Sequence, residues 1–111
     1  MQTLNEGIEL LYTRDCRNWQ QTLLNLKQVL KEEKIKEEPK LVIMDTMEQA
    51  RMYNFFSSPT VHINGQDVDP QVRRTGKRGL GVDRPYFYEG RSWGFPSKEM
   101  IKKAIKDLYF I

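Results

Sequence analysis

Two short stretches of the chain hold residue types that could act together chemically. Cys16 is the only cysteine, and it follows a short apolar run and precedes a helical pattern. The second stretch, Ser58-Pro59-Thr60, leads into a β-branched run that contains His62, the only histidine. A thiol at the start of a helix faces unpaired backbone N–H groups, which favour the nucleophilic thiolate. Cys16 is therefore the candidate catalytic residue, with Arg17 and Trp19 beside it as candidate binding residues.

A lone thiol limits the reaction that such a site supports. Attack of Cys16 on a disulfide gives a mixed disulfide, which only an outside thiol can then release. The expected activity is at most monothiol thiol–disulfide exchange or the binding of a thiol ligand, with a small thiol or a cysteine-containing protein as partner. A second interpretation stays open, because a free cysteine is often a small buried hydrophobic residue. Trp19 then simply begins the core-facing side of the helix.

The remaining chemistry-bearing residues do not predict a metal or cofactor site. One cysteine and one histidine are too few for a dedicated zinc or iron–sulfur centre. Asp67 and Asp69 alternate with Val68, so we expect them on the solvated face of a short strand. His62 alternates with apolar neighbours and is expected to be a surface or packed histidine rather than a base for Cys16. No metal and no cofactor are therefore expected.

Hydrophobic periodicity predicts the elements that position these residues. Apolar runs predict strands at 8–12 and 41–44, and the second run is typical of a central strand covered on both faces. Apolar residues at steps of three and four predict a helix that begins at Trp19, and Leu24 is expected on its inner face. They also predict a short helix with Met47 on its inner face. A last helix begins after Ser97. Asn64-Gly65 predicts a type I′ turn between two short strands, and the bond before Pro59 is expected to be cis.

Taken in order, these elements predict a single α/β domain over residues 1–111, with the order βαβαββα and a mixed sheet flanked by helices. This order resembles the thioredoxin fold, with Cys16 at the active-site position and Pro59 at the cis-proline position. More narrowly, the chain is similar to small thioredoxin-like proteins of an alkylmercury-lyase-like and selenoprotein-related branch. Residues 55–69 carry this resemblance, because they match that family's Phe-x-Gly-Ser-Pro-Thr loop and Asn-Gly-x-Asp-Val-Asp turn.

The resemblance also implies roles for single residues. The family carries Cys-x-x-Cys after the first strand and a later Cys-Arg-x-Tyr, but here Trp19 and Asp83 stand at the positions of the second and third cysteines. The implied site is therefore a degenerate Cys-x-x-Trp site with one thiol. Mercury chemistry, which needs several converging thiolates, receives no support. In this fold the backbone of Ser58, just before Pro59 and Thr60, is expected to pair with an extended thiol ligand.

Positive charge is concentrated in one stretch of the chain. Residues 1–70 carry 8 basic and 11 acidic groups, whereas residues 71–91 carry 6 basic and 2 acidic groups. Glycines and prolines punctuate residues 71–96, which predicts a basic loop insertion. Its arginines, among them Arg73 and Arg84, could bind an anionic ligand by paired contacts, could dock the partner of a non-enzymatic binding module, or could only keep the loop soluble. In the first case the segment would fold over Cys16 and Pro59.

The overall composition bounds the partners and the compartment. The net charge of +3 is modest and no RNA-binding motif is present, so nucleic acid is not the favoured partner. No apolar run approaches bilayer length, and the first residues have neither a basic start nor an apolar stretch. With one cysteine and no internal disulfide, the sequence predicts a cytoplasmic protein without a membrane partner.

Overall fold

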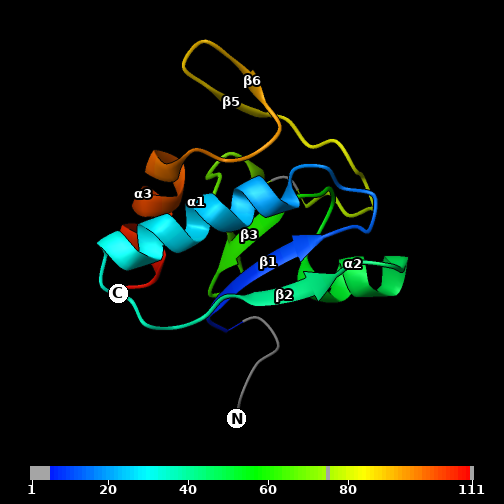
Figure 1. Ribbon diagram of the computed structural model, residues 1–111. Helices are drawn as coiled ribbons and strands as arrows, with labels where there is room; N and C mark the ends of the chain where they lie inside the picture. The colour runs from blue at the N-terminus through cyan, green and yellow to red at the C-terminus, as the bar shows by residue number, and fades with distance from the viewer. Residues whose placement is uncertain (1–5, 75, 111) are drawn as a thin grey trace.

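The computed structural model describes residues 6–74 and 76–110, and it is a mixed α/β structure (Figure 1). A mixed sheet of four strands and three α-helices form the main body, beside a separate two-stranded hairpin. None of the helices in this part of the chain has the length and apolar character to cross a membrane. In chain order the elements are β1 (Ile8–Tyr12), α1 (Trp19–Glu32), β2 (Lys40–Ile43), α2 (Met47–Tyr53), β3 (Thr60–Ile63), β4 (Gln66–Asp67), the 3₁₀ helix η1 (Val72–Arg74), β5 (Tyr86–Tyr88), β6 (Arg91–Trp93) and α3 (Lys98–Leu108).

The main sheet has the strand order β2-β1-β3-β4. β1 runs parallel to β2, with Leu10 opposite Leu41, and antiparallel to β3, with Leu10 opposite Val61. β4 pairs antiparallel with the other side of β3. The parallel pair is joined through α1, since parallel neighbours need a long crossover. The antiparallel pair β3–β4 needs only a two-residue turn.

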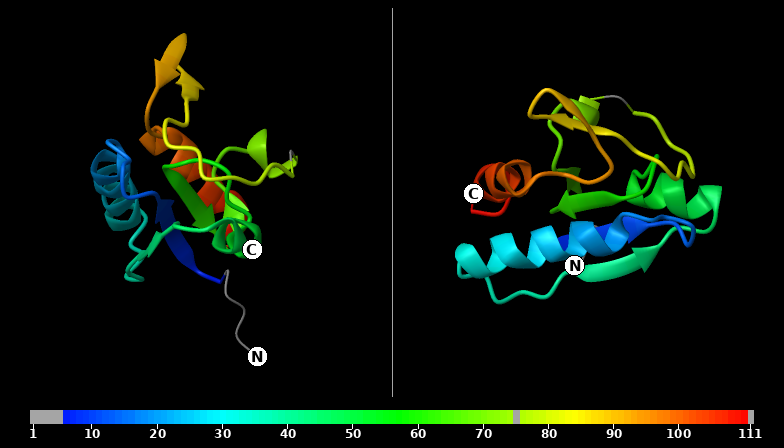
Figure 2. Two further views of the ribbon diagram at one scale, coloured as in Figure 1. Left: turned by 90° about the vertical axis from the view of Figure 1, so that its right-hand side faces the viewer. Right: turned by 45° about the horizontal axis from the view of Figure 1, so that its top comes forward.

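The main core lies between the sheet and helices α1 and α3, which cover the same face (Figure 2). Side chains alternate between the two faces of a strand, so Leu10 shares this face with Ile8, and Val61 shares it with Ile63. Burial of one such aliphatic side chain contributes roughly 1.5–3 kcal/mol, so this layer supplies most of the hydrophobic stabilisation. Its fully buried aliphatic residues include Ile8, Leu10, Leu26, Val29, Val61, Ile63, Ile101 and Ile105.

The opposite face of the sheet is covered by α2 and by loops, and it is more polar. Glu9 of β1 and His62 of β3 are directly opposite each other in the antiparallel register. Both alternate with core residues, so both point to this second face. A small apolar cluster lies beside them and is made of Leu11, Met44, Ala50 and Phe55.

β2 is an edge strand, and the prediction of a central strand for this run is wrong. Within the described residues β2 pairs with β1 alone, and its register ends with Ile43 opposite Tyr12. Leu41 is 46% exposed as a result. An unbroken apolar run indicates burial on two faces but does not reveal the number of neighbouring strands, which is what decides the position in the sheet.

Helices α2 and α3 begin with a side-chain cap, while two expected core positions are exposed. Thr46 and Gln49 form a capping box at the start of α2, and the Ser97 hydroxyl caps α3. The expectation that Leu24 and Met47 face the core is wrong, because they are 62% and 38% exposed. Leu24 lies at the side of a helix whose inner face is already filled, and Met47 is the first residue of its helix.

The turn and the proline bond of the β3 region agree with the sequence. Asn64 and Gly65 both have positive φ, at 51° and 81°, as the predicted turn requires. The Asn64 side chain accepts a hydrogen bond from Gly7 N (2.9 Å) and donates one to Leu108 O (3.0 Å). This one side chain therefore ties the start of β1 to the end of α3. The Ser58–Pro59 bond is cis, as expected.

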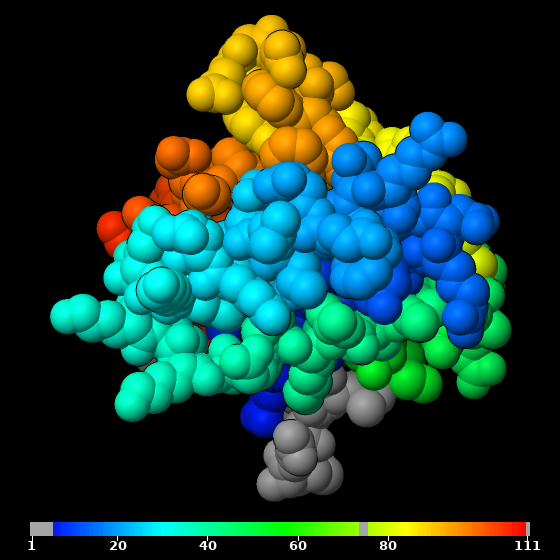
Figure 3. Space-filling view, viewed as in Figure 1, coloured from blue at the N-terminus to red at the C-terminus, as the bar shows by residue number. Residues whose placement is uncertain are grey.

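The segment predicted as a basic loop insertion is partly regular. It contains η1 and a hairpin in which Tyr86 pairs with Trp93 and Tyr88 pairs with Arg91. The hairpin stands away from the main sheet and protrudes above α1 and α3 in Figures 1 and 3. The ring of Tyr88 stacks on that of Trp93 with 5.1 Å between centroids, and the guanidinium carbon of Arg91 lies 3.9 Å from the centroid of the Trp93 ring.

Candidate functional site: the loops around Cys16 and Pro59

Cys16 lies in the loop between β1 and α1 and is 6% exposed. Its backbone N–H donates to Thr13 O at 3.1 Å, which closes a turn directly after β1. The N-cap of α1 is Asn18, so the thiol stands two residues before the cap rather than on the first turn. The sequence placed Cys16 correctly after the first strand and slightly too close to the helix.

A buried hydrogen bond joins the cysteine loop to the proline loop. Thr13 N donates to Ser58 Oγ at 3.0 Å, and Ser58 is fully buried. The carbonyl of Pro59 accepts a hydrogen bond from the hydroxyl of Tyr86, and Pro59 is itself buried. The two stretches singled out from the sequence, around Cys16 and around Pro59, are therefore brought together by the structure.

The residues beside the cysteine differ in their surroundings. Trp19 is half-buried and stacks on Tyr12 with 4.6 Å between ring centroids, and both rings pack against the main core. Arg17 is exposed. Trp19 thus has a packing role at the start of α1, as one of the two sequence interpretations proposed.

The backbone of Ser58 is already occupied, which corrects the expectation that it pairs with an extended ligand. Ser58 N donates to Gly81 O at 2.8 Å, and Ser58 O accepts from Arg84 N at 3.0 Å. A Cβ atom at Gly81 would lie only 2.6 Å from Ser57 Oγ, so this close approach requires glycine. The chain's own residues 79–84 therefore run beside residues 55–58, and a ligand strand finds no open backbone groups at Ser58.

Arg84 has a role within the fold instead of the ligand-binding role expected from the sequence. Its guanidinium contacts both carboxylate oxygens of Asp67, at 2.8 and 2.9 Å, and donates to Thr60 Oγ1 at 2.8 Å. It also lies 4.2 Å from the centroid of the Tyr86 ring. Arg84 is 2% and Asp67 is 6% exposed, so the prediction that Asp67 forms a solvated face is also wrong. Both differences from the sequence expectation have one cause, because nothing around Asp67 or Arg84 in the sequence indicates that these two residues form a pair.

Two further titratable groups are buried on this face of the sheet, and the sequence did not single out the first. Burial raises the pKa of Glu9 to about 7, although the charge of Lys40 on the neighbouring strand opposes the shift. Burial lowers the pKa of His62 to about 4, against the opposing effect of Asp67. Glu9 Oε1 and His62 Nδ1 have no hydrogen-bond partner among the described residues. The period-two alternation with core residues was the available sign of where Glu9 points.

The described residues hold no group of three or more potential metal ligands from histidine, cysteine and acidic side chains.

No family model, curated protein or solved structure matches the chain significantly.

The geometry of these loops and of the polar face of the sheet is what bears on the function. That geometry consists of a buried single thiol, a proline loop whose backbone is occupied, and a polar face held by the Arg84–Asp67 pair.

Proposed function

We propose that the chain is a thioredoxin-like, non-enzymatic binding module whose anionic ligand or partner docks on the basic segment. The occupied backbone of Ser58 carries this proposal, because exchange in this fold requires an extended substrate beside the cysteine loop. The strand order β2-β1-β3-β4, with β3 antiparallel to both neighbours, supports the thioredoxin-like assignment. The burial of Cys16 agrees with a packing role for its side chain.

The basic segment supplies the charge for such a module. Arg73 and Arg78 of the segment after β4 form no ion pair with a carboxylate in the described part of the chain. Arg84, in contrast, is neutralised by Asp67. Uncompensated cations on one segment attract an anionic partner and speed its association. We therefore place the docking surface on Arg73 and residues 76–78, within the wider segment 71–96 named from the sequence.

A thiol-exchange assay tests the non-enzymatic part of this proposal. The protein is incubated with a glutathionylated peptide and reduced glutathione, and release of the peptide is followed over time. We expect equal rates for the wild type and for Cys16→Ser, with or without the added small thiol. A rate that depends on Cys16 would overturn the proposal.

Monothiol exchange at Cys16 is the second candidate, and the hydrogen bond from Thr13 N to Ser58 Oγ favours it because that bond joins the two loops. In that reaction the Cys16 thiolate attacks one sulfur of a disulfide, a mixed disulfide forms, and the other sulfur leaves as a thiolate. An outside thiolate then attacks the mixed disulfide and releases Cys16. This route requires residues 79–84 to move away from Ser58, so exchange that accelerates when Arg84 is replaced would support it.

A further inference from the structure

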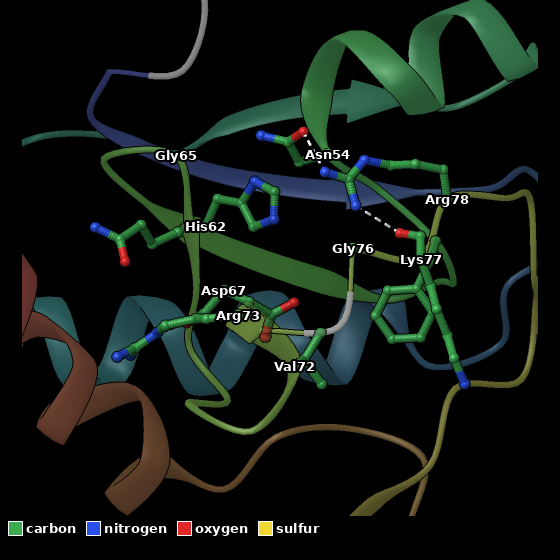
Figure 4. A pocket seen from close by; sticks show the side chains of 11 residues that line it. Asn54, His62, Gly65, Asp67, Val72, Arg73, Gly76, Lys77 and Arg78 are labelled. Atoms are coloured by element: carbon green, nitrogen blue, oxygen red, sulfur yellow. Dashed lines mark hydrogen bonds between the residues drawn. The ribbon is translucent and has the colours of Figure 1, made fainter.

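A pocket of about 200 Å³ lies on the polar face of the sheet, between the β3–β4 turn, the end of α2 and the segment after η1 (Figure 4). The ring of His62 lies at its centre, between Asn54 and Arg78 on one side and Asp67 and Arg73 on the other. Cys16 and Pro59 do not line it. The pocket is therefore separate from the loops around the thiol.

The lining of the pocket carries excess positive charge. Arg73, Lys77 and Arg78 contribute cations, and Asp67 is its one carboxylate residue. Asp67 is already paired with Arg84 through both of its oxygens. Asp67 therefore does not neutralise Arg73 or Arg78, and these two arginines form no ion pair with a carboxylate among the described residues.

The two arginines of the rim are held in place by neutral oxygens. Arg78 donates to Asn54 Oδ1 and to Lys77 O, each at 2.7 Å, and Arg73 Nε donates to the backbone carbonyl of Asp67. A guanidinium has five N–H donors, so each arginine keeps donors for a further acceptor. The two side chains lie on opposite walls of the pocket, with Arg78 beside Asn54 and Arg73 beside Asp67 (Figure 4).

His62 forms the floor as a neutral group. It is 1% exposed and its Nδ1 has no partner among the described residues. Its pKa of about 4 leaves the imidazole uncharged at pH 7. The neutral imidazole therefore adds no charge to the floor of the pocket.

We propose that this pocket binds a phosphate group, either as inorganic phosphate or as the end of a small phosphomonoester. The inference rests on the proposed function and names the ligand class of the same basic segment. Donors from opposite walls suit a tetrahedral group with several oxygens, whereas a planar carboxylate is satisfied by one arginine. The small volume fits one such group, since sites for drug-sized ligands are roughly 300–1,000 Å³.

The single histidine makes a direct test practical, because the imidazole signals of His62 need no assignment. Proton–nitrogen NMR spectra of the histidine ring are recorded at pH 7 and constant ionic strength while inorganic phosphate is added. Parallel titrations use glycerol 3-phosphate and acetate. We expect a saturable shift with one or both phosphates, and affinity for acetate at least about tenfold weaker. A saturable shift with both identifies the phosphate group itself as the ligand, and a shift with only one identifies the source.

Variants separate the pocket from general charge. Arg73→Gln and Arg78→Gln keep a long polar side chain, and each is expected to weaken phosphate binding by about tenfold. Arg91→Gln removes the same charge from the β5–β6 hairpin, which lies outside the pocket, and is expected to change the affinity by less than about twofold. Arg78→Lys keeps the charge and serves if Arg78→Gln does not fold.

Three results overturn the proposal: no saturable shift of His62 in the wild type, acetate binding as tightly as phosphate, or Arg91→Gln weakening binding as much as Arg78→Gln. The wild-type titration alone decides the first two. Failure here is distinct from failure of the proposed function. Cys16-dependent exchange would overturn the non-enzymatic assignment and leave the phosphate result unchanged, and loss of the phosphate site would leave the exchange assay unchanged.

Discussion

The guanidinium of Arg84 contacts both carboxylate oxygens of Asp67, and these two buried side chains join the segment before β5 to β4. The backbone of Arg84 meanwhile bonds to Ser58. One residue thus fixes the course of residues 79–84 over the proline loop. The pair also leaves the nearby rim arginines without a carboxylate, which links the stability of this region to its proposed binding role.

Removing Arg84 should destabilise the protein strongly. Arg84→Met leaves the buried Asp67 without its counter-charge, and such a change costs roughly 3–5 kcal/mol. Urea denaturation gives the free energy of unfolding. Arg14→Met is the matched control, because its ion pair with Asp45 is exposed and should contribute far less to stability than the buried pair. The double variant Arg84→Met with Asp67→Leu should recover much of the loss, and equal losses for Arg84→Met and Arg14→Met would contradict the prediction.

Asn64 should be important for stability out of proportion to its exposure. Asn64→Ala loses two hydrogen bonds and places an alanine at a φ of 51°. We expect a loss of roughly 2–3 kcal/mol in the free energy of unfolding, from about 1 kcal/mol per bond plus the backbone cost. Asn64→Gly removes the bonds but accepts the backbone conformation, so it should lose less. If the glycine variant were less stable than the alanine variant, the backbone part of this account would be wrong.

The stability of the protein should depend on pH through Glu9. Its pKa is raised from 4.5 to about 7 in the folded state, so unfolding releases a proton between these values. The stabilisation from protonated Glu9 is therefore complete below pH 4.5 and is lost as the pH rises to about 7. Relative to Glu9→Gln, the wild type should lose roughly 1–3 kcal/mol across this range. Urea denaturation at pH 5, 6, 7 and 8 measures the difference, and a constant difference would refute a buried, neutral Glu9.

His62 should give the opposite pH dependence. Its pKa is lowered from 6.5 to about 4, so the unfolded chain takes up a proton that the folded protein excludes. The stability contributed by neutral His62 is complete above pH 6.5 and is lost as the pH falls towards 4. Burial is the main cause of the lowered pKa, Asp67 opposes it, and Arg84 and Arg78 reinforce it. Once Glu9 is replaced by Gln, stability should rise between pH 4 and 6.5, and His62→Phe should remove that rise.

Cys16 should react slowly in the folded protein. With 6% of the residue exposed, alkylation by iodoacetamide requires a local opening of the loop. We expect a rate on the order of tenfold or more below that of the urea-unfolded chain, measured by mass spectrometry. Arg84→Met should increase the rate in the folded protein, because it releases the segment bonded to Ser58. Alkylation at the unfolded rate would show that the thiol is accessible without opening.

Local patterns predicted the elements of this fold well. The periodicity of residues 8–12, 19–32 and 98–108 gave a strand and two helices, and Asn64-Gly65 gave the turn, because each signal depends only on neighbours along the chain. Residues 91–93 carry no strand signal, since a three-residue strand with two exposed members has no clear alternation. The tertiary partners were less accessible. No pattern of neighbouring residues indicates that Arg84 pairs with Asp67. None indicates that the carbonyl of Gly81 accepts the hydrogen bond from Ser58 N.

The candidate sites show the same division. The sequence identified the loops of Cys16 and Pro59 from residue type and order, and the structure brings them together through Thr13 and Ser58. It named Arg73 within a basic stretch but could not distinguish it from Arg84. One lies at the rim of a pocket and the other is buried in an ion pair, and that difference depends on the path of the chain after β4.

The position of β2 at the border of the sheet has a consequence for the behaviour of the protein at high concentration. An unpaired strand border offers N–H and C=O groups to a second molecule, and such borders promote self-association. Here the strand is only four residues long, begins with Lys40 and follows Pro39, which has no N–H to donate. A short, charged and proline-flanked border is a poor template for a neighbouring chain. Replacing Pro39 and Lys40 with β-branched residues would lengthen the strand that can pair, and would favour intermolecular sheet formation through β2.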